Sequence, residues 1–421
     1  MPEKPTRSAL PEKPKNRRQL SSAITIIVLF GIISMFGDLV YESARGANSQ
    51  YFNLLGVSAA QVGLVFGVGE FIGYFLRLIA GVLSDRSGKH WLFIFIGYGM
   101  LIVVPVIGLT LNWPIIVVLL LMERIGKSLR NPAKDTVLSG VAENKVGTGF
   151  AFGLQEALDQ VGAMLGPLIF TLVFFLMGKN EIPQYQLSYQ LLFIPYVLLM
   201  IVLVFVYRKF KSSTADVTLN VREYRSERLP KIFWIYAAFT FFCALGFVNF
   251  SIIGYHLKAS ELLTDGNITL LYAAAMAVDA VAALVIGKAY DLRKEQLGKK
   301  TGGLAILAVI PFLTLLLPML TLGNSVVLIV IGMTLFGIVM GSHEAIMRSA
   351  IADITPYYKR GTSFGLFNTG YGLALLIGSS LMGWLYDMSL ISVIIGITCI
   401  AEAIAACCYV WMVRTVKHGE T

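Results

Sequence analysis

The chain has 421 residues, of which 56% are hydrophobic and 14% are charged, and its formal net charge is +9. This composition excludes a soluble globular protein, because so much apolar surface could not be hidden from water. The basic residues form short clusters between apolar stretches, which argues against a nucleic-acid partner, and the four cysteines and four histidines lack metal-site spacing, so we expect no metal and no cofactor.

Twelve apolar stretches are each long enough to cross a bilayer, which takes about 20 helical residues. The sequence therefore predicts an all-α polytopic membrane protein in contact with lipid. The fourth span is the least apolar, since charged residues follow Met122. In chain order the predicted spans are Ser22–Tyr41, Ala59–Val82, Trp91–Leu111, Trp113–Leu138, Phe150–Met177, Tyr189–Tyr207, Ile232–Tyr255, Ile268–Tyr290, Gly303–Leu322, Ser325–Ile351, Phe364–Tyr386 and Ile391–Val413.

A long basic stretch between the sixth and seventh spans predicts a division into two halves. Internal repetition agrees, because Gly81–Arg86 is echoed by Gly287–Arg293, each just after the second span of its half. We expect two pseudo-symmetric six-helix bundles around a central pathway. The predicted units are a cytoplasmic basic tail 1–20, an N-terminal bundle 21–207, a cytoplasmic linker 208–231, a C-terminal bundle 232–413 and a cytoplasmic tail 414–421.

Lysine and arginine distribution predicts the orientation, because cytoplasmic loops carry an excess of these residues. With the N-terminus inside, nearly all loop lysines and arginines fall on one side, among them Lys134, and only Arg45, Lys179 and Lys258 fall on the other. The sequence thus predicts a multi-pass plasma-membrane protein of a bacterial inner membrane, with both termini cytoplasmic.

The sharpest local motif is Gly81-Val-Leu-Ser-Asp-Arg-Ser-Gly-Lys-His90, between the second and third spans. Glycine permits a tight turn, while aspartate and arginine at a helix end can pair with neighbouring helices and helix dipoles. This decapeptide, the twelve spans and the central linker resemble the major facilitator superfamily over Ser21–Val413. Lys89 and His90 stand where that family usually has two basic residues. The resemblance implies a bacterial-type, twelve-span secondary transporter and not an enzyme, and we expect a monomer.

The resemblance further implies a gating role for the motif, as a latch of the closed state. The residues concerned are Gly81, Asp85, Arg86, Gly88 and Lys89, with Asp291 and Arg293 in the second copy.

Two further matches to the family are weaker. Arg124 in the fourth span stands where the family has an arginine associated with proton coupling, and Lys127, Asn131 and Lys134 share its helical face. The alternative for Arg124 is snorkelling at the interface. Gly162-x-x-x-Gly166-Pro167 in the fifth span resembles a motif of proton-coupled exporters, although a plain helix-packing role is an equal alternative.

Acids inside the spans are the remaining candidates, because burying a charge in a bilayer is costly outside a pathway or an ion pair. We assign proton coupling to Asp38, Glu42, Arg124 and Glu70, since acids are denser in the first half. We assign the substrate cavity to Glu156, Asp159, Asp279, His343 and Glu344. A structural ion pair is the alternative for each acid and helix packing for His343, and Glu402 is interpreted as structural.

The leading hypothesis is proton-coupled export of small organic compounds, amphipathic or cationic, with protons as the second partner. One alternative is a proton symporter that imports a small, anionic metabolite, with the basic face of the fourth span as its anchor. Another is a membrane sensor or assembly partner without transport.

The orientation can be tested with reporter fusions. Fusions after Lys145 and Lys299 should report the cytoplasm, and fusions near Lys179 and Lys258 the opposite side, because of the basic-residue asymmetry. A cytoplasmic signal at Lys179 would contradict the twelve-span topology.

Overall fold

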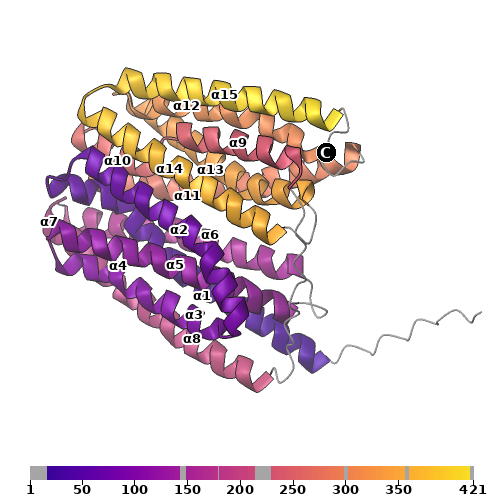
Figure 1. Ribbon diagram of the computed structural model, residues 1–421. Helices are drawn as coiled ribbons and strands as arrows, with labels where there is room; N and C mark the ends of the chain where they lie inside the picture. The colour runs from indigo at the N-terminus through magenta and orange to yellow at the C-terminus, as the bar shows by residue number, and fades with distance from the viewer. Residues whose placement is uncertain are drawn as a thin grey trace, which may run out of the picture.

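The computed structural model describes residues 17–142, 148–178, 180–213, 229–297, 302–355 and 360–417. Long helices lie side by side and run between two ends of the molecule (Figure 1). The described chain both starts and ends at one of these two ends, where α8 also ends and α9 begins. We call this the linker end, and we call the opposite one the far end. Among the described residues there is no strand.

The described residues between Arg17 and Ser213 form six crossings, of which the third and the sixth are assembled from shorter helices. They are α1 (Arg17–Leu54), α2 (Ala59–Ser87), α3 (His90–Gly99) with η1 (Met100–Ile102), α4 (Val103–Val106) and η2 (Ile107–Leu109), α5 (Trp113–Ala142), α6 (Thr148–Met177), and α7 (Ile182–Leu191) with α8 (Phe193–Ser213).

The described residues between Lys231 and Lys417 form six more crossings, and here the first and the third are composite. They are α9 (Lys231–Gly246) with α10 (Phe250–Ala259), α11 (Asp265–Leu297), η3 (Gly302–Val309) with α12 (Ile310–Thr321), α13 (Val326–Ile354), α14 (Arg360–Asp387) and α15 (Ile391–Lys417).

Eleven stretches of the described chain are long and apolar enough to cross a membrane by themselves. The remaining crossing is α5, the fourth predicted span. It carries too many charged residues to count as an apolar membrane-spanning helix by itself. It nevertheless runs lengthwise against α2 and α3. The predicted all-α polytopic fold is therefore confirmed. Most of the predicted linker, residues 214–228, lies outside the described residues, so the domain boundaries stay a prediction.

The first helix is much longer than predicted, and this moves several charges. Because α1 runs to Leu54 and not to Tyr41, Arg45 lies inside the bundle and not in an outer loop. Lys134 likewise lies buried within α5, although we had counted it in a cytoplasmic loop. The predicted first span ended too early to include Arg45, and the basic-residue count placed Lys134 in a loop although the predicted fourth span, Trp113–Leu138, contains it. Both charges face the protein interior and not lipid.

The seventh predicted span is broken in the middle, between α9 and α10. The Asn249 side chain accepts a hydrogen bond from the Ile252 N–H at 3.3 Å and so caps α10. The Thr398 hydroxyl donates to the Gly246 carbonyl at 3.1 Å. Irregular backbone at membrane depth is tolerated only where such groups or a cavity satisfy it, and Phe247 and Asn249 do line a cavity.

Small residues let α6 pack backbone to backbone against α1. A Cβ atom at Gly162 would overlap the Met35 carbonyl oxygen, and one at Gly166 would lie 2.5 Å from that of Leu39. Any larger residue must therefore push the two helices apart. Pro167 follows directly, and its carbonyl accepts a hydrogen bond from the Thr171 hydroxyl at 3.2 Å.

A pair of alanine substitutions on α6 tests this packing. Gly162→Ala should lower the thermal unfolding temperature in detergent, with a loss of about 1–3 kcal/mol, because the new methyl group meets backbone. Gly153→Ala is the matched control, since a Cβ there meets nothing within 4 Å. Equal unfolding temperatures for the two variants would contradict the close α1–α6 contact.

Candidate functional site

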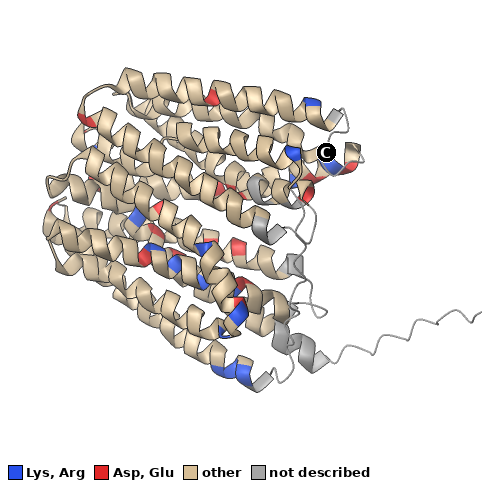
Figure 2. Cartoon of the chain, in the orientation of Figure 1, with Lys and Arg blue, Asp and Glu red and all other residues tan. Residues whose placement is uncertain are grey.

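A cavity of about 770 Å³ lies between the two halves. Its walls come from α1, α2, α5 and α6 on one side, and from the α9–α10 break, α11, α13 and α14 on the other. It extends from Glu42 and Arg45, in the middle of α1, to Asp85 at the linker end of α2. Figure 2 shows a group of charges within the N-terminal half of the bundle, whereas most of the remaining helical surface is uncharged.

The far end of the bundle is closed by contacts between the halves. The Asp387 carboxylate, at the end of α14, accepts hydrogen bonds from the N–H groups of Ala59 and Ala60 at 2.9 Å each. These groups form the N-terminus of α2, where the helix dipole favours a negative charge. The Tyr255 hydroxyl donates to the Val57 carbonyl at 2.9 Å. The cavity therefore opens toward the linker end.

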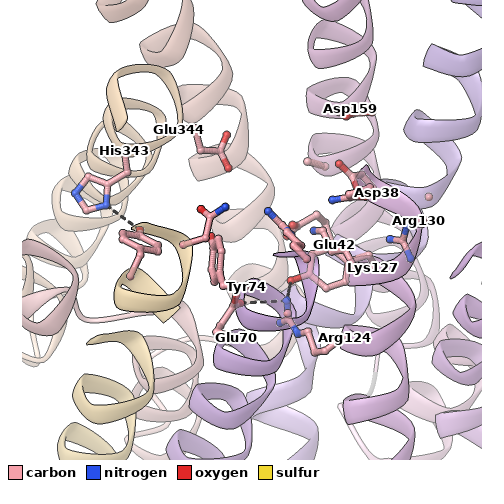
Figure 3. A pocket seen from close by; sticks show the side chains of 18 of the residues that line it. Asp38, Glu42, Glu70, Tyr74, Arg124, Lys127, Arg130, Asp159, His343 and Glu344 are labelled. Carbon is pink, nitrogen blue, oxygen red and sulfur yellow. Dashed lines mark hydrogen bonds and ion pairs between the residues drawn. The ribbon is translucent and has the colours of Figure 1, made fainter. Parts of the chain in front are cut away.

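An ion network lies at the inner end of the cavity on the N-terminal half. Arg124 of α5 is 7% exposed and pairs with Glu70 of α2 at 3.1 Å, while its guanidinium also donates to the Tyr41 hydroxyl. Arg45 lies 3.8 Å from Glu70 and 3.4 Å from Glu42. Figure 3 shows Glu70 and Arg124 side by side. Each of these charges is partnered, as burial away from water requires.

One hydrogen bond connects this network to the other half of the molecule. The Tyr272 hydroxyl of α11 donates to Glu42 Oε2 at 2.6 Å, and Glu42 Oε1 faces Arg45. Both oxygens of Glu42 are thus engaged, one by each half. A change in the charge of Glu42 would act on the contact between the halves.

The basic face predicted on the fourth span lines the cavity, with Arg124, Lys127, Asn131 and Lys134 all on its wall. The Lys127 ammonium lies 3.7 Å from the centre of the Tyr41 ring, a cation–π contact. The Lys134 ammonium donates to the Ser34 hydroxyl at 2.5 Å.

The acids of the first half face these cations. Asp38 of α1 and Asp159 of α6 line the same cavity as Lys127 and Lys134 of α5. Glu156 lines the same cavity. The first-half acids that we assigned to proton coupling and to substrate thus share one polar wall.

The wall formed by the C-terminal half has a different character. It carries the aromatic residues Phe247, Phe250, Phe364, Phe367 and Tyr371, and its described lining residues include no lysine or arginine. Its ionisable groups are the predicted cavity residues Asp279, His343 and Glu344. The Tyr371 hydroxyl lies 3.1 Å from His343 Nδ1. Figure 3 shows His343 and Glu344 across the cavity from Lys127 and Arg124.

The predicted gating motif lies at the linker end. Gly88 has φ +64° and terminates α2, with its N–H donating to the Ser84 carbonyl at 3.0 Å. Asp85 faces the cavity mouth and lies 3.9 Å from His90 Nδ1. Gly81 approaches Pro132 of α5. The other members of the motif, Arg86 and Lys89 with Asp291 and Arg293 of the second copy, lie outside the cavity.

The predicted site residues leave out three residues of the ion network, Arg45, Tyr41 and Tyr272. Arg45 follows Glu42 and Asp38 on one helical face, so its spacing could have placed it inside. No sequence signal separates Tyr41 and Tyr272 from the other tyrosines of the chain. Glu402 does not line the cavity, and neither of its carboxyl oxygens has a hydrogen-bond partner among the described residues.

The described residues form twelve crossings around a charged central cavity that is closed at one end, an architecture typical of membrane transport proteins. The family model of the Major Facilitator Superfamily matches residues 19–342 and 259–421. The chain belongs to this superfamily.

The relatives and solved structures agree with this assignment. The uncharacterized protein Rv2265 of Mycobacterium tuberculosis is 35% identical over 89% of both chains, and the MFS-type transporter MJ1317 of Methanocaldococcus jannaschii is 26% identical over 89% of this chain and 91% of its own. A mutant of the nucleoside transporter NupG superimposes with a TM-score of 0.71 at 11% identity over 92% of this chain and 99% of its own. A bacterial homologue of the lysosomal transporter Spinster, in an inward-facing unoccupied conformation, gives 0.66 at 14% identity over 95% and 98%.

The gating role of Asp85 can be tested by neutralising it. Asp85→Asn should lower the transport rate severalfold while the protein stays folded and inserted, because it removes a charge at the cavity mouth and no core contact. Glu295→Gln, exposed near the linker end of α11, should transport at the wild-type rate. Unchanged transport in Asp85→Asn, measured as flux per inserted protein, would remove Asp85 as a gate.

Proposed function

We propose that this transporter couples proton movement to the export of small organic compounds, amphipathic or cationic, by alternating access. The lining of the cavity supports this proposal, because aromatic rings and acids together suit a cation with an apolar body. Nine described lining residues are acidic and six are basic: Asp38, Glu42, Glu70, Asp85, Asp135, Glu156, Asp159, Asp279 and Glu344 against Arg45, Arg77, Arg124, Lys127, Arg130 and Lys134.

Glu42 supplies a physical route from a proton to a conformational change. When ionised, it pairs with Arg45 and accepts the hydrogen bond from Tyr272. A proton on Glu42 removes the charge that holds both partners, so the contact between α1 and α11 weakens. The equilibrium between the state open at the linker end and the state open at the far end then shifts, because the α1–α11 contact has a different free energy with Glu42 protonated than with Glu42 ionised. Asp38, one turn away and facing Lys127, is the second coupling candidate.

The opposite direction of transport has one observation in its favour. The basic face of α5, from Arg124 to Lys134, lines the cavity and could hold an anionic metabolite that is imported with protons. Against this, Arg124 and Lys134 already contact acidic or hydroxyl groups of the protein. Export of a cation is therefore the proposal, and import of an anion is the alternative that the same experiment tests.

The experiment uses inverted membrane vesicles that hold an internal pH-sensitive dye and are acidified by respiration. Addition of ethidium, an aromatic cation, should release protons from vesicles that contain the transporter and not from vesicles without it. Proton release from vesicles that are loaded internally with benzoate, without ethidium, would instead favour the import alternative, because a symporter would carry benzoate and protons out of the lumen together. No release with either compound, from vesicles shown to contain the folded protein, would contradict proton-coupled transport of both classes.

The coupling acids can be separated by single substitutions. Asp38→Asn and Glu42→Gln should each be compared for proton-driven transport and for gradient-free exchange of labelled substrate. A variant of a coupling residue should lose proton-driven transport and keep substrate exchange, because the substitution removes the proton-carrying group and leaves substrate binding in place. If both variants keep full proton-driven transport, coupling does not reside on α1.

A further inference from the structure

Asp279 is a buried carboxylate on the wall of the C-terminal half that the coupling scheme above leaves unused. It lies in the membrane-spanning part of α11, is 2% exposed and lines the cavity. Its Oδ1 atom has no hydrogen-bond partner among the described residues. A buried acceptor without a partner costs free energy, so such an atom points to a proton or a ligand that completes it.

No lysine or arginine among the described residues lies within ion-pair distance of Asp279. The acids Glu344 of α13, Glu42 of α1 and Glu156 of α6 line the same cavity. This setting is the opposite of that of Glu70, which lies within ion-pair distance of both Arg124 and Arg45. Glu70 therefore has two partners of opposite charge, whereas a bound cation would supply the partner that Asp279 lacks in its ionised form.

Other groups that line the same cavity suit a cation with an apolar body. Gln160 donates to Glu344 Oε2 at 3.2 Å. His343 on α13 is 5% exposed, and its Nε2 has no partner among the described residues. The ring of Phe247 lies 5.8 Å from that of His343. Acid, amide and aromatic groups are therefore available in one cavity.

The backbone of α13 leaves room for Asp279 only because residue 341 is glycine. A Cβ atom at Gly341 would lie 2.9 Å from Asp279 Oδ1 and 2.5 Å from the Asp279 carbonyl oxygen. One turn earlier, a Cβ atom at Gly337 would overlap the Ala275 carbonyl oxygen in a similar way but would not touch the carboxylate. The two glycines therefore share the packing role, and Gly341 alone also positions the carboxylate.

We propose that Asp279 is the site at which a proton and the positive group of an organic cation replace each other, with Gly341 as its positioning residue. This inference rests on the proposed function and names its cation site. The proton leaves the Asp279 carboxyl for cavity water when the cation binds, and it returns when the cation leaves. Asp279 and the α1 acids then act in one cycle, because Glu42 and Asp279 repel each other when both are ionised.

The protonated form can be trapped on the purified full-length protein in detergent. Dicyclohexylcarbodiimide reacts with protonated carboxyls in apolar surroundings, and mass spectrometry locates the adduct. An adduct at Asp279 should form more readily as the pH falls, and ethidium should prevent it while benzoate should not. No adduct at any pH, or an adduct that ethidium leaves unchanged, would overturn the proposal.

Binding is measured independently by ethidium fluorescence anisotropy. Asp279→Asn should weaken binding by about tenfold or more and remove its dependence on pH, because proton and cation no longer compete. Glu295→Gln, on the same helix but outside the cavity, should bind as the wild type does. Wild-type affinity and pH dependence in Asp279→Asn would contradict the site.

The two glycines separate positioning from general packing. Gly341→Ala and Gly337→Ala should both lower the unfolding temperature, but only Gly341→Ala should also weaken ethidium binding and shift the pH profile of the carbodiimide adduct. Equal effects of the two variants on binding would overturn the positioning role of Gly341. Failure of vesicle transport with intact ethidium binding would instead contradict the proposed function and leave the Asp279 site standing.

Discussion

The structure depends on a constraint that lipid imposes: a charge inside the bundle must have a partner or face a water-filled cavity. The Arg124–Glu70 pair, 3.1 Å apart, meets this constraint and brings α5 and α2 together at the inner end of the cavity. Arg45 extends the pair to α1. A helix as charged as α5 can cross the bundle because its cations face these acids and the cavity and not lipid.

In the proposed cycle the two walls of the cavity have different roles. The N-terminal wall holds paired charges, and in the proposal a proton changes one of them. The C-terminal wall offers Asp279 and aromatic rings, which lack an internal cation among the described residues. Between the walls, Tyr272 and Glu42 form a contact that is sensitive to charge. Such a contact is what a two-state protein needs if proton and substrate are to influence each other.

Alternation of the open end also requires contacts that can break at low cost. At the far end, Asp387 holds the N-terminus of α2 through two hydrogen bonds. These are not covalent or metal links, so opening exchanges them for bonds to water. The backbone contacts at Gly63 and Gly383, close to Ser379 and Ala59 across the same boundary, let the helices pack tightly without interlocking side chains.

Hydropathy predicted the helical membrane fold, because lipid selects strongly for long apolar helices. The superfamily was predicted from the resemblance of the Gly81–His90 motif, the twelve spans and the linker. The hydropathy and basic-residue counts had limits. They misplaced Arg45 and Lys134, since a hydropathy window does not register which helical face a charge occupies. The face shared by Arg124 and Lys134 was predictable from its spacing. The partner of Glu42 was not, because Tyr272 is 230 residues away along the chain and only the tertiary fold brings it near.

The most direct test of alternating access is a distance measurement across the far end. Spin labels at Leu64 of α2 and Met388 after α14, both exposed, would be placed in a chain whose four cysteines are replaced by alanine. Pulsed electron paramagnetic resonance in lipid nanodiscs then reports the distance distribution in alkaline and acidic buffer, with and without ethidium. Alternating access predicts that at least one of the four conditions gives a single short distance. It also predicts that at least one other condition adds a population at a longer distance, as the Asp387 contacts open. A single unchanged distance under all four conditions would contradict it.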